Sequence, residues 1–229
     1  MLHGFLPSLL EGASVTLAVA LSSLAVALLL GLLGALAKLS RSRVAQGLAA
    51  VYTTLIRGVP DLVLMLLIFY GGQLAVNTLA PMLGHEDYID IDPFVAGVLT
   101  IGFIFGAYLT EAFRGAFLAV PPGQREAGMA FGMSRRQVLW RITLPQMLRH
   151  ALPGVSNNWL VLIKSTAIVS VIGLSDLMTR GQQAAGTTRE PFSFYLAVAA
   201  IYLLFTSASE LCFAWANRKL AIGVKEGQL

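Results

Sequence analysis

Five charged side chains and two hydroxyls lie in or beside long apolar segments of the 229-residue chain. An ionised group is expensive at membrane depth, so each must pair with another group or bind a charged solute. These residues are therefore candidates for a substrate path or for its gating: Arg57, Asp61, Glu111, Arg114, Lys164, Ser165 and Thr166.

Two of these charged pairs have the spacing of local ion pairs. Arg57 and Asp61 are four residues apart with Pro60 between them, so the segment kinks or begins there and the pair can face each other across the break. Glu111 and Arg114 are three apart, on one face of a helix. The alternative for both pairs is a purely structural ion pair near the lipid headgroups.

Sequence patterns for covalent chemistry are absent. The only Lys-Ser-Thr, at Lys164, has Ile163 and Asn158 where a phosphate-binding loop needs glycines. No H-E-x-x-H or G-x-S-x-G occurs, the histidines at positions 3, 85 and 150 are scattered, and Cys212 is a single cysteine. We expect no catalytic residue, no metal site and no cofactor bound by this chain.

The composition indicates a membrane protein. Hydrophobic residues make up 56% of the chain and charged ones 12%, and the mean hydropathy is +0.74. Soluble domains have about 25% charged residues. Five apolar segments approach the roughly 20 residues that cross a bilayer as a helix. We expect one all-α integral membrane domain over 1–229, with transmembrane helices at about 12–37, 58–80, 93–114, 151–175 and 191–215.

The basic residues predict an orientation. Thirteen of the sixteen fall in the first and third connections, at the start of the second segment or in the C-terminal tail. Because Lys and Arg are retained inside, the N-terminus is expected in the periplasm and the C-terminus in the cytoplasm. The other side is acidic, which suits either a cationic ligand or plain solvation. The thirteen are Lys38, Arg41, Arg43, Arg57, Arg114, Arg125, Arg135, Arg136, Arg141, Arg149, Arg218, Lys219 and Lys225.

The third connection is long and carries a motif. Within Arg114 to His150, a short helix over 124–131 is expected to end at Gly132, and Ser134 with Gln137 predicts a capping box for a second helix. The spacing resembles the E-A-A-x3-G-x9-I-x-L-P loop of ABC importer permeases, with glycine in place of the second alanine. The matching residues are Glu126, Ala127, Gly128, Gly132, Ile142, Leu144 and Pro145.

The resemblance implies the role of this loop, which we place at 121–147. In that family it forms the coupling helices that dock on a cytoplasmic ATPase. Arg135, Arg136 and Arg141 could then meet acidic groups on the ATPase, although anionic headgroups or retention of positive charge inside explain them as well.

Other segments extend the resemblance to nearly the whole chain. The stretches 52–61, 106–115, 122–124 and 164–166 look like permeases of polar amino acid uptake, and 56–70, 89–93 and 223–225 look most like the HisQ-type permeases of the histidine, lysine, arginine and ornithine system. The resemblance implies the type I ABC importer fold and a place in the bacterial inner membrane.

The resemblance also implies partners: a second permease (a homologue or another copy of this chain), two ATPase subunits that bind ATP and Mg, and a periplasmic binding protein, in a lipid bilayer and without nucleic acid. For a cationic substrate Asp61 is the first choice of acceptor and Glu111 the second, with Lys164 for the substrate carboxylate. Gly102-x3-Gly106 predicts a close helix contact, within the subunit or between permeases.

Alternative functions remain on the sequence alone. A permease of the same family could carry other polar amino acids or opines. An ion-coupled secondary transporter fits poorly, since five spans show no doubled repeat. A membrane-embedded enzyme lacks a nucleophile or metal constellation, and a scaffold without transport does not explain the loop motif.

Overall fold

The computed structural model describes residues 4–84 and 87–220, and every regular element among them is a helix. His3, His85 and the tail segment 223–225 lie outside the described residues. The helices are α1 (Leu6–Leu39), α2 (Arg43–Gly58), α3 (Asp61–Leu79), η2 (Ala80–Leu83), α4 (Pro93–Leu118), α5 (Pro122–Ala130), α6 (Arg135–Val138), η3 (Leu139–Thr143), α7 (Leu144–Ser165), η4 (Thr166–Ile172), α8 (Leu177–Thr188) and α9 (Pro191–Leu220).

Five stretches of helix are long and apolar enough to cross a membrane, which confirms the number of spans. Their bounds differ from the expected ones. The first helix begins at Leu6 rather than near residue 12, because Pro7 and the apolar residues after it extend the helix by almost two turns. The fourth begins within the connection, where α6, η3, α7 and η4 follow one another over Arg135–Ile172.

Helix α2 is a separate element that was not predicted. The Ser42 side chain accepts a hydrogen bond from the Ala45 amide at 3.3 Å and starts the helix, and Val59 and Pro60 in extended conformation end it. The following span therefore begins at Asp61 rather than 58. This outcome agrees with the expectation that the chain breaks at Pro60.

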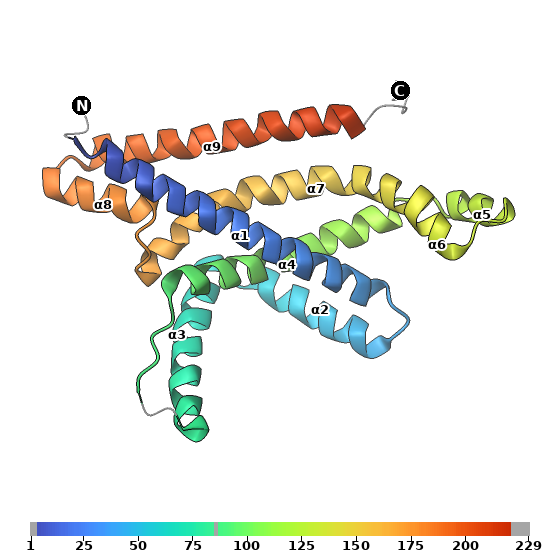
Figure 1. The fold of residues 1–229 in the computed structure, drawn as a ribbon, viewed down its shortest axis with the longest axis horizontal. Coiled ribbons are helices and arrows are strands. Elements are labelled where there is room, and N and C mark those ends of the chain that lie inside the picture. Colours follow the sequence, from blue (N-terminus) through green and yellow to red (C-terminus); the bar gives the residue numbers. More distant parts are fainter. Residues whose placement is uncertain (1–3, 85–86, 221–229) are drawn as a thin grey trace.

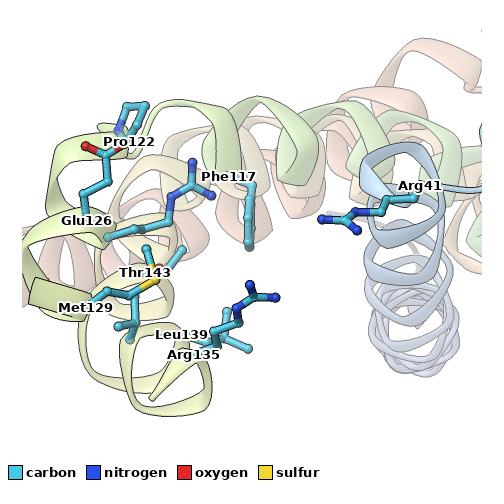
Figure 2. A pocket seen from close by; sticks show the side chains of 10 residues that line it. Arg41, Phe117, Pro122, Glu126, Met129, Arg135, Leu139 and Thr143 are labelled. Atoms are coloured by element: carbon cyan, nitrogen blue, oxygen red, sulfur yellow. The ribbon is translucent and has the colours of Figure 1, made fainter. Parts of the chain in front are cut away.

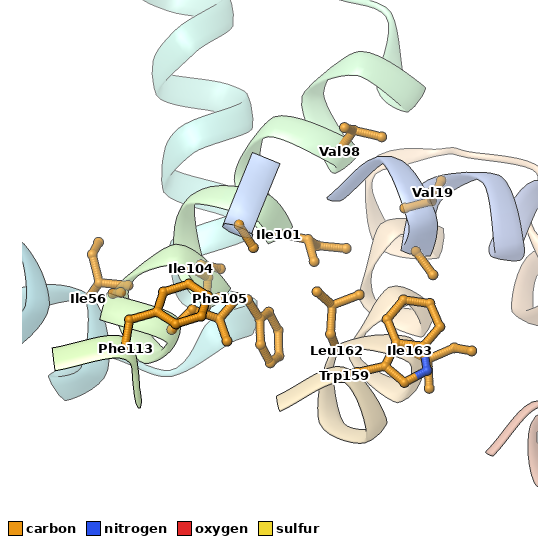
Figure 3. Packing of buried hydrophobic residues seen from close by; sticks show 14 of the residues in the cluster. Val19, Ile56, Val98, Ile101, Ile104, Phe105, Phe113, Trp159, Leu162 and Ile163 are labelled. Carbon is orange, nitrogen blue, oxygen red and sulfur yellow. The ribbon is translucent and has the colours of Figure 1, made fainter. Parts of the chain in front are cut away.

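Helices α1, α4 and α7 form the centre of the bundle (Figure 1). Most of the core side chains, among them Val19, Ile101 and Leu162, lie where these helices meet (Figure 3). A Cβ on Gly102 would lie 2.6 Å from Val26 Cβ, and one on Gly106 would lie 2.8 Å from Leu30 Cβ. The predicted glycine contact is thus an α1–α4 contact within the subunit.

The outer helices expose their apolar side chains. α3 projects away from the long axis of the bundle, and α9 runs along one side of it (Figure 1). Only 11% of the most apolar window of α3 and 6% of that of α9 is buried. A second core cluster, which includes Leu9, Leu177 and Phe194, joins α1, α8 and the start of α9 at the other end of the bundle from the α5–α6 connection (Figure 1).

Candidate functional site

Three charged side chains meet where the C-terminal end of α1 crosses α2 and α4. Lys38 forms an ion pair with Oε1 of Glu111, and Arg114 Nε donates to Oε2 of the same carboxylate at 3.0 Å. Lys38 Nζ also donates to Thr53 Oγ1 of α2 at 2.6 Å. The Lys38 and Glu111 side chains are only 14% and 23% exposed, so the network connects three helices in a partly dehydrated place.

Three residues of the network line a cavity of about 410 Å³, namely Lys38, Thr53 and Glu111, together with Thr54, Arg57, Gly58 and Tyr108. The Arg57 guanidinium lies 5.4 Å from the centre of the Tyr108 ring, within the range of a cation–π contact. It makes no ion pair with Asp61 in the described part of the chain, so the predicted Arg57–Asp61 pair is wrong. The extended Val59 and Pro60 separate the two helices that carry these residues.

Asp61 is the first residue of α3 and is half-buried. A carboxylate in the first turn is favoured by the positive end of the helix dipole, and within the described residues no cation pairs with Asp61. Glu111, by contrast, has both of its oxygens occupied by cations. Of the two candidate acceptors for a cationic side chain, Asp61 is therefore the more available.

Lys164, Ser165 and Thr166 lie where α7 tightens into η4. Lys164 is exposed and its ammonium group has no ion pair or hydrogen bond among the described residues, whereas Thr166 is buried and donates to the Ile163 carbonyl at 2.7 Å. Thr166 is thus committed to the local backbone. Lys164 faces away from the core of its own subunit and is free to meet an anion.

The other end of the bundle has its own polar contacts. Arg180 of α8 donates to Glu11 of α1 at 2.6 Å and to Ser8 at 3.2 Å. Asp176 caps α8 by accepting from the Thr179 amide at 2.9 Å, but its second oxygen has no partner among the described residues. Burial raises the pKa of the Asp176 carboxyl above its usual range.

The motif of the long connection folds into a bent unit, which we call the elbow (residues 121–147). The φ of Gly132 is +78°, a left-handed conformation that side chains disfavour, so α5 ends there as expected. Ser134 and Gln137 form the predicted capping box at the start of α6. Both sequence-based expectations for the elbow's helices are confirmed.

The two halves of the motif touch each other inside the elbow. A Cβ on Gly128 would lie 2.6 Å from Ile142 Cδ1 and 3.1 Å from Val138 Cγ2. Glycine in place of the motif's usual alanine thus lets α5 pack closely on η3, a π-helical turn. Leu144 packs against the main core cluster, whereas Glu126, Ala127 and Pro145 are exposed. Because α6, η3 and α7 are continuous, the elbow is joined rigidly to the core.

Sequence reasoning missed Lys38, Thr53 and Tyr108 as parts of the cavity around Glu111. Lys38 is 73 residues from Glu111, and a lysine at the end of an apolar segment is expected on orientation grounds alone. A usable signal was Glu111 itself, since its depth demands a cation and Arg114 supplies only one of two possible contacts.

Comparisons with known proteins agree with the fold. Residues 27–222 match the family model "Binding-protein-dependent transport system inner membrane component". The chain is 53% identical to the histidine/lysine/arginine/ornithine transport system permease protein HisQ of Escherichia coli, over all of both chains. It is 42% identical to the octopine transport system permease protein OccQ of Rhizobium radiobacter, over 96% of this chain and 92% of the relative.

A solved structure described as an amino acid ABC transporter with histidines superposes with a TM-score of 0.79 at 31% identity, covering 93% of this chain and 94% of that one. The family-model match, residues 27–222, covers the charged network, the elbow, four of the spans and part of the first. The chain therefore belongs to the family of binding-protein-dependent transport system inner membrane components, as a permease of the ABC transporter type.

Proposed function

We propose that this permease imports cationic amino acids, namely histidine, lysine, arginine and ornithine. The observation that carries the proposal is the 53% identity over the full length to the Escherichia coli permease named for those four substrates. The half-buried Asp61, which has no cation partner in the described chain, supplies the acceptor that such a substrate needs. The octopine permease at 42% identity favours opines as the second candidate substrate class.

The proposed assembly has two permeases of this fold, two ATPase subunits and a periplasmic binding protein. ATP and Mg bind only to the ATPase, and this chain performs no covalent chemistry. The elbow supports the arrangement because it combines an exposed Glu126–Ala127 face with a continuous connection into α7. We place the elbow and the C-terminus in the cytoplasm and the N-terminus in the periplasm, following the positive-inside distribution.

Asp61 and Lys164 are proposed to hold the two ends of the substrate. Asp61 accepts the charged side chain, and Lys164 binds the α-carboxylate. Glu111, held by Lys38 and Arg114, instead locks α1 to α4 near the elbow and belongs to gating rather than to binding. Arg57 lines the same cavity as Glu111, and Ser165 follows Lys164 at the end of α7. Thr166 maintains the turn after α7.

The test compares the uptake of arginine with the uptake of histidine in the Asp61→Asn variant. At about pH 8 the imidazole is neutral and arginine is charged, so only arginine depends on a carboxylate. A charge-assisted hydrogen bond contributes about 1.5–3 kcal/mol, which corresponds to a roughly 10- to 150-fold lower arginine uptake with histidine nearly unchanged. At about pH 5.5 histidine uptake is expected to fall as well.

The assay is initial uptake by cells that contain the complete transporter and lack other uptake systems for these amino acids. Asp90→Asn is the matched control, because Asp90 is exposed in the connection between α3 and α4. Equal losses of arginine uptake and histidine uptake at both pH values would assign Asp61 a structural role. Uptake of octopine without uptake of arginine or histidine would favour the opine alternative.

A further inference from the structure

A second cavity, of about 400 Å³, lies at the end of α4 between the elbow and the turn that follows α1. Three arginines line it from three separate places in the chain: Arg41 from the α1–α2 turn, Arg125 from α5 and Arg135 from the start of α6. Figure 2 shows the guanidinium groups of Arg41 and Arg135 directed toward the same gap, with Phe117 at its edge.

None of the three guanidinium groups has an ion pair or hydrogen bond within the described residues. Glu126 also lines the cavity but pairs with none of them, so its lining carries three positive charges and one negative. Like charges brought together on one cavity raise its potential and favour an anion there. Guanidinium groups bind phosphate oxygens in a bidentate manner, which makes phosphate the best-matched anion.

Apart from Thr143, the remaining lining is apolar and includes Phe117, Met129, Val138 and Leu139. Phe117 lies in the last turn of α4, a membrane-spanning helix that ends at Leu118, so the cavity is at the depth where a hydrocarbon core meets the headgroups. A free phosphate ion gains nothing from contact with an apolar wall at that depth. A phospholipid needs both a cationic rim for its phosphate and an apolar surface for the start of its acyl chains.

We propose that this cavity binds the headgroup of an anionic phospholipid. The arginines fit this occupant better than acidic side chains of a docking ATPase, because Arg41 belongs to the α1–α2 turn and not to the elbow. Arg136 and Arg141 lie on the elbow outside this cavity and remain available for a protein partner. A lipid bound here bridges the α1–α2 turn and the elbow, because both segments contribute to the lining of the cavity.

The experiment measures lipid retention by native mass spectrometry on the full chain, purified in mild detergent with its co-purifying subunits. The probes are phosphatidylglycerol and, as the zwitterionic comparison, phosphatidylcholine. The cavity variant Arg41→Gln/Arg125→Gln/Arg135→Gln is matched by Arg43→Gln/Arg136→Gln/Arg141→Gln, which removes the same charge from exposed positions that do not line the cavity. Size exclusion and circular dichroism report folding, and Arg41→Gln alone, in a turn, serves if the cavity variant misfolds.

The expected result is a loss of phosphatidylglycerol retention of at least about tenfold in the cavity variant, since each basic residue near an anionic surface contributes roughly fivefold. The matched variant is expected to retain the lipid within about twofold.

Three results would overturn the proposal. Equal losses in both variants indicate general surface charge. If millimolar inorganic phosphate alone stabilises the folded chain as much as the lipid does, the cavity is a free-phosphate site. Loss of the co-purifying ATPase with lipid retention unchanged indicates a protein contact. The readout does not involve transport, so it is independent of the proposed substrate.

Discussion

The α1–α4 contact makes a sharp prediction for Gly102→Ala. The new methyl carbon would lie 2.6 Å from Val26 Cβ and 3.2 Å from the Ser23 carbonyl oxygen, whereas ordinary contacts begin at 3.4 Å. Val26 Cβ cannot rotate away, because it is fixed to the backbone, so α1 must retreat by about 0.8 Å. A gap of that size forfeits a quarter to a half of each neighbouring dispersion contact.

Overpacking of this kind costs about 1–3 kcal/mol of unfolding free energy. Gly115→Ala is the matched control on the same helix, since a Cβ there meets nothing within 4 Å. Replacing an unconstrained helical glycine contributes about 0.5–1 kcal/mol of stability. Gly102→Ala is therefore expected to lower the unfolding free energy and Gly115→Ala to raise it, so that the two variants differ from each other by about 1.5–4 kcal/mol.

The assay is unfolding from mixed micelles by a denaturing detergent, followed by circular dichroism and tryptophan fluorescence. Equal unfolding free energies for the two variants would contradict this prediction, because the α1–α4 distance would then not depend on the absence of a side chain at position 102.

The other predictions concern the charged contacts at the two ends of the bundle. Glu111→Gln is expected to lower the unfolding free energy by about 1–3 kcal/mol, since Lys38 and Arg114 lose a shared carboxylate in a partly dehydrated place. The control Glu11→Gln is expected to change it by less than about 1 kcal/mol, because the Glu11 side chain is 68% exposed. Equal effects of the two substitutions in detergent unfolding would contradict this prediction. Because the pKa of Asp176 is raised in the folded chain, the unfolded chain gives up this proton first and stability falls as pH rises through the acid range. Asp176→Asn keeps the cap on Thr179 and is expected to remove that loss above the folded pKa, and an unfolding free energy that keeps the parent's pH dependence would argue against it.

Features governed by local chemistry were predictable from sequence. The capping box at Ser134, the helix end at Gly132 and the Glu111–Arg114 pair all depend on residues within a few positions of one another. The five spans were also predictable, because a bilayer imposes length and apolarity on each helix separately.

Features that depend on the crossing of distant helices were not predictable. Lys38 reaches Glu111 only because α1 packs on α4, and Arg57 turns to Tyr108 rather than Asp61 because α2 lies beside α4. Helix α2 escaped notice because its polar residues hide it from a search for apolar segments, although Ser42 is a recognisable N-cap.

In the proposed function, this chain carries a cationic amino acid only when a partner ATPase acts on the elbow. The most direct measurement is uptake of labelled arginine into proteoliposomes that contain the permeases and the ATPase, with loaded binding protein outside and ATP inside. Arginine accumulation is expected to require enclosed ATP and the binding protein and to be unaffected by collapsing ion gradients. Accumulation without ATP that follows an imposed ion gradient would contradict the proposed function.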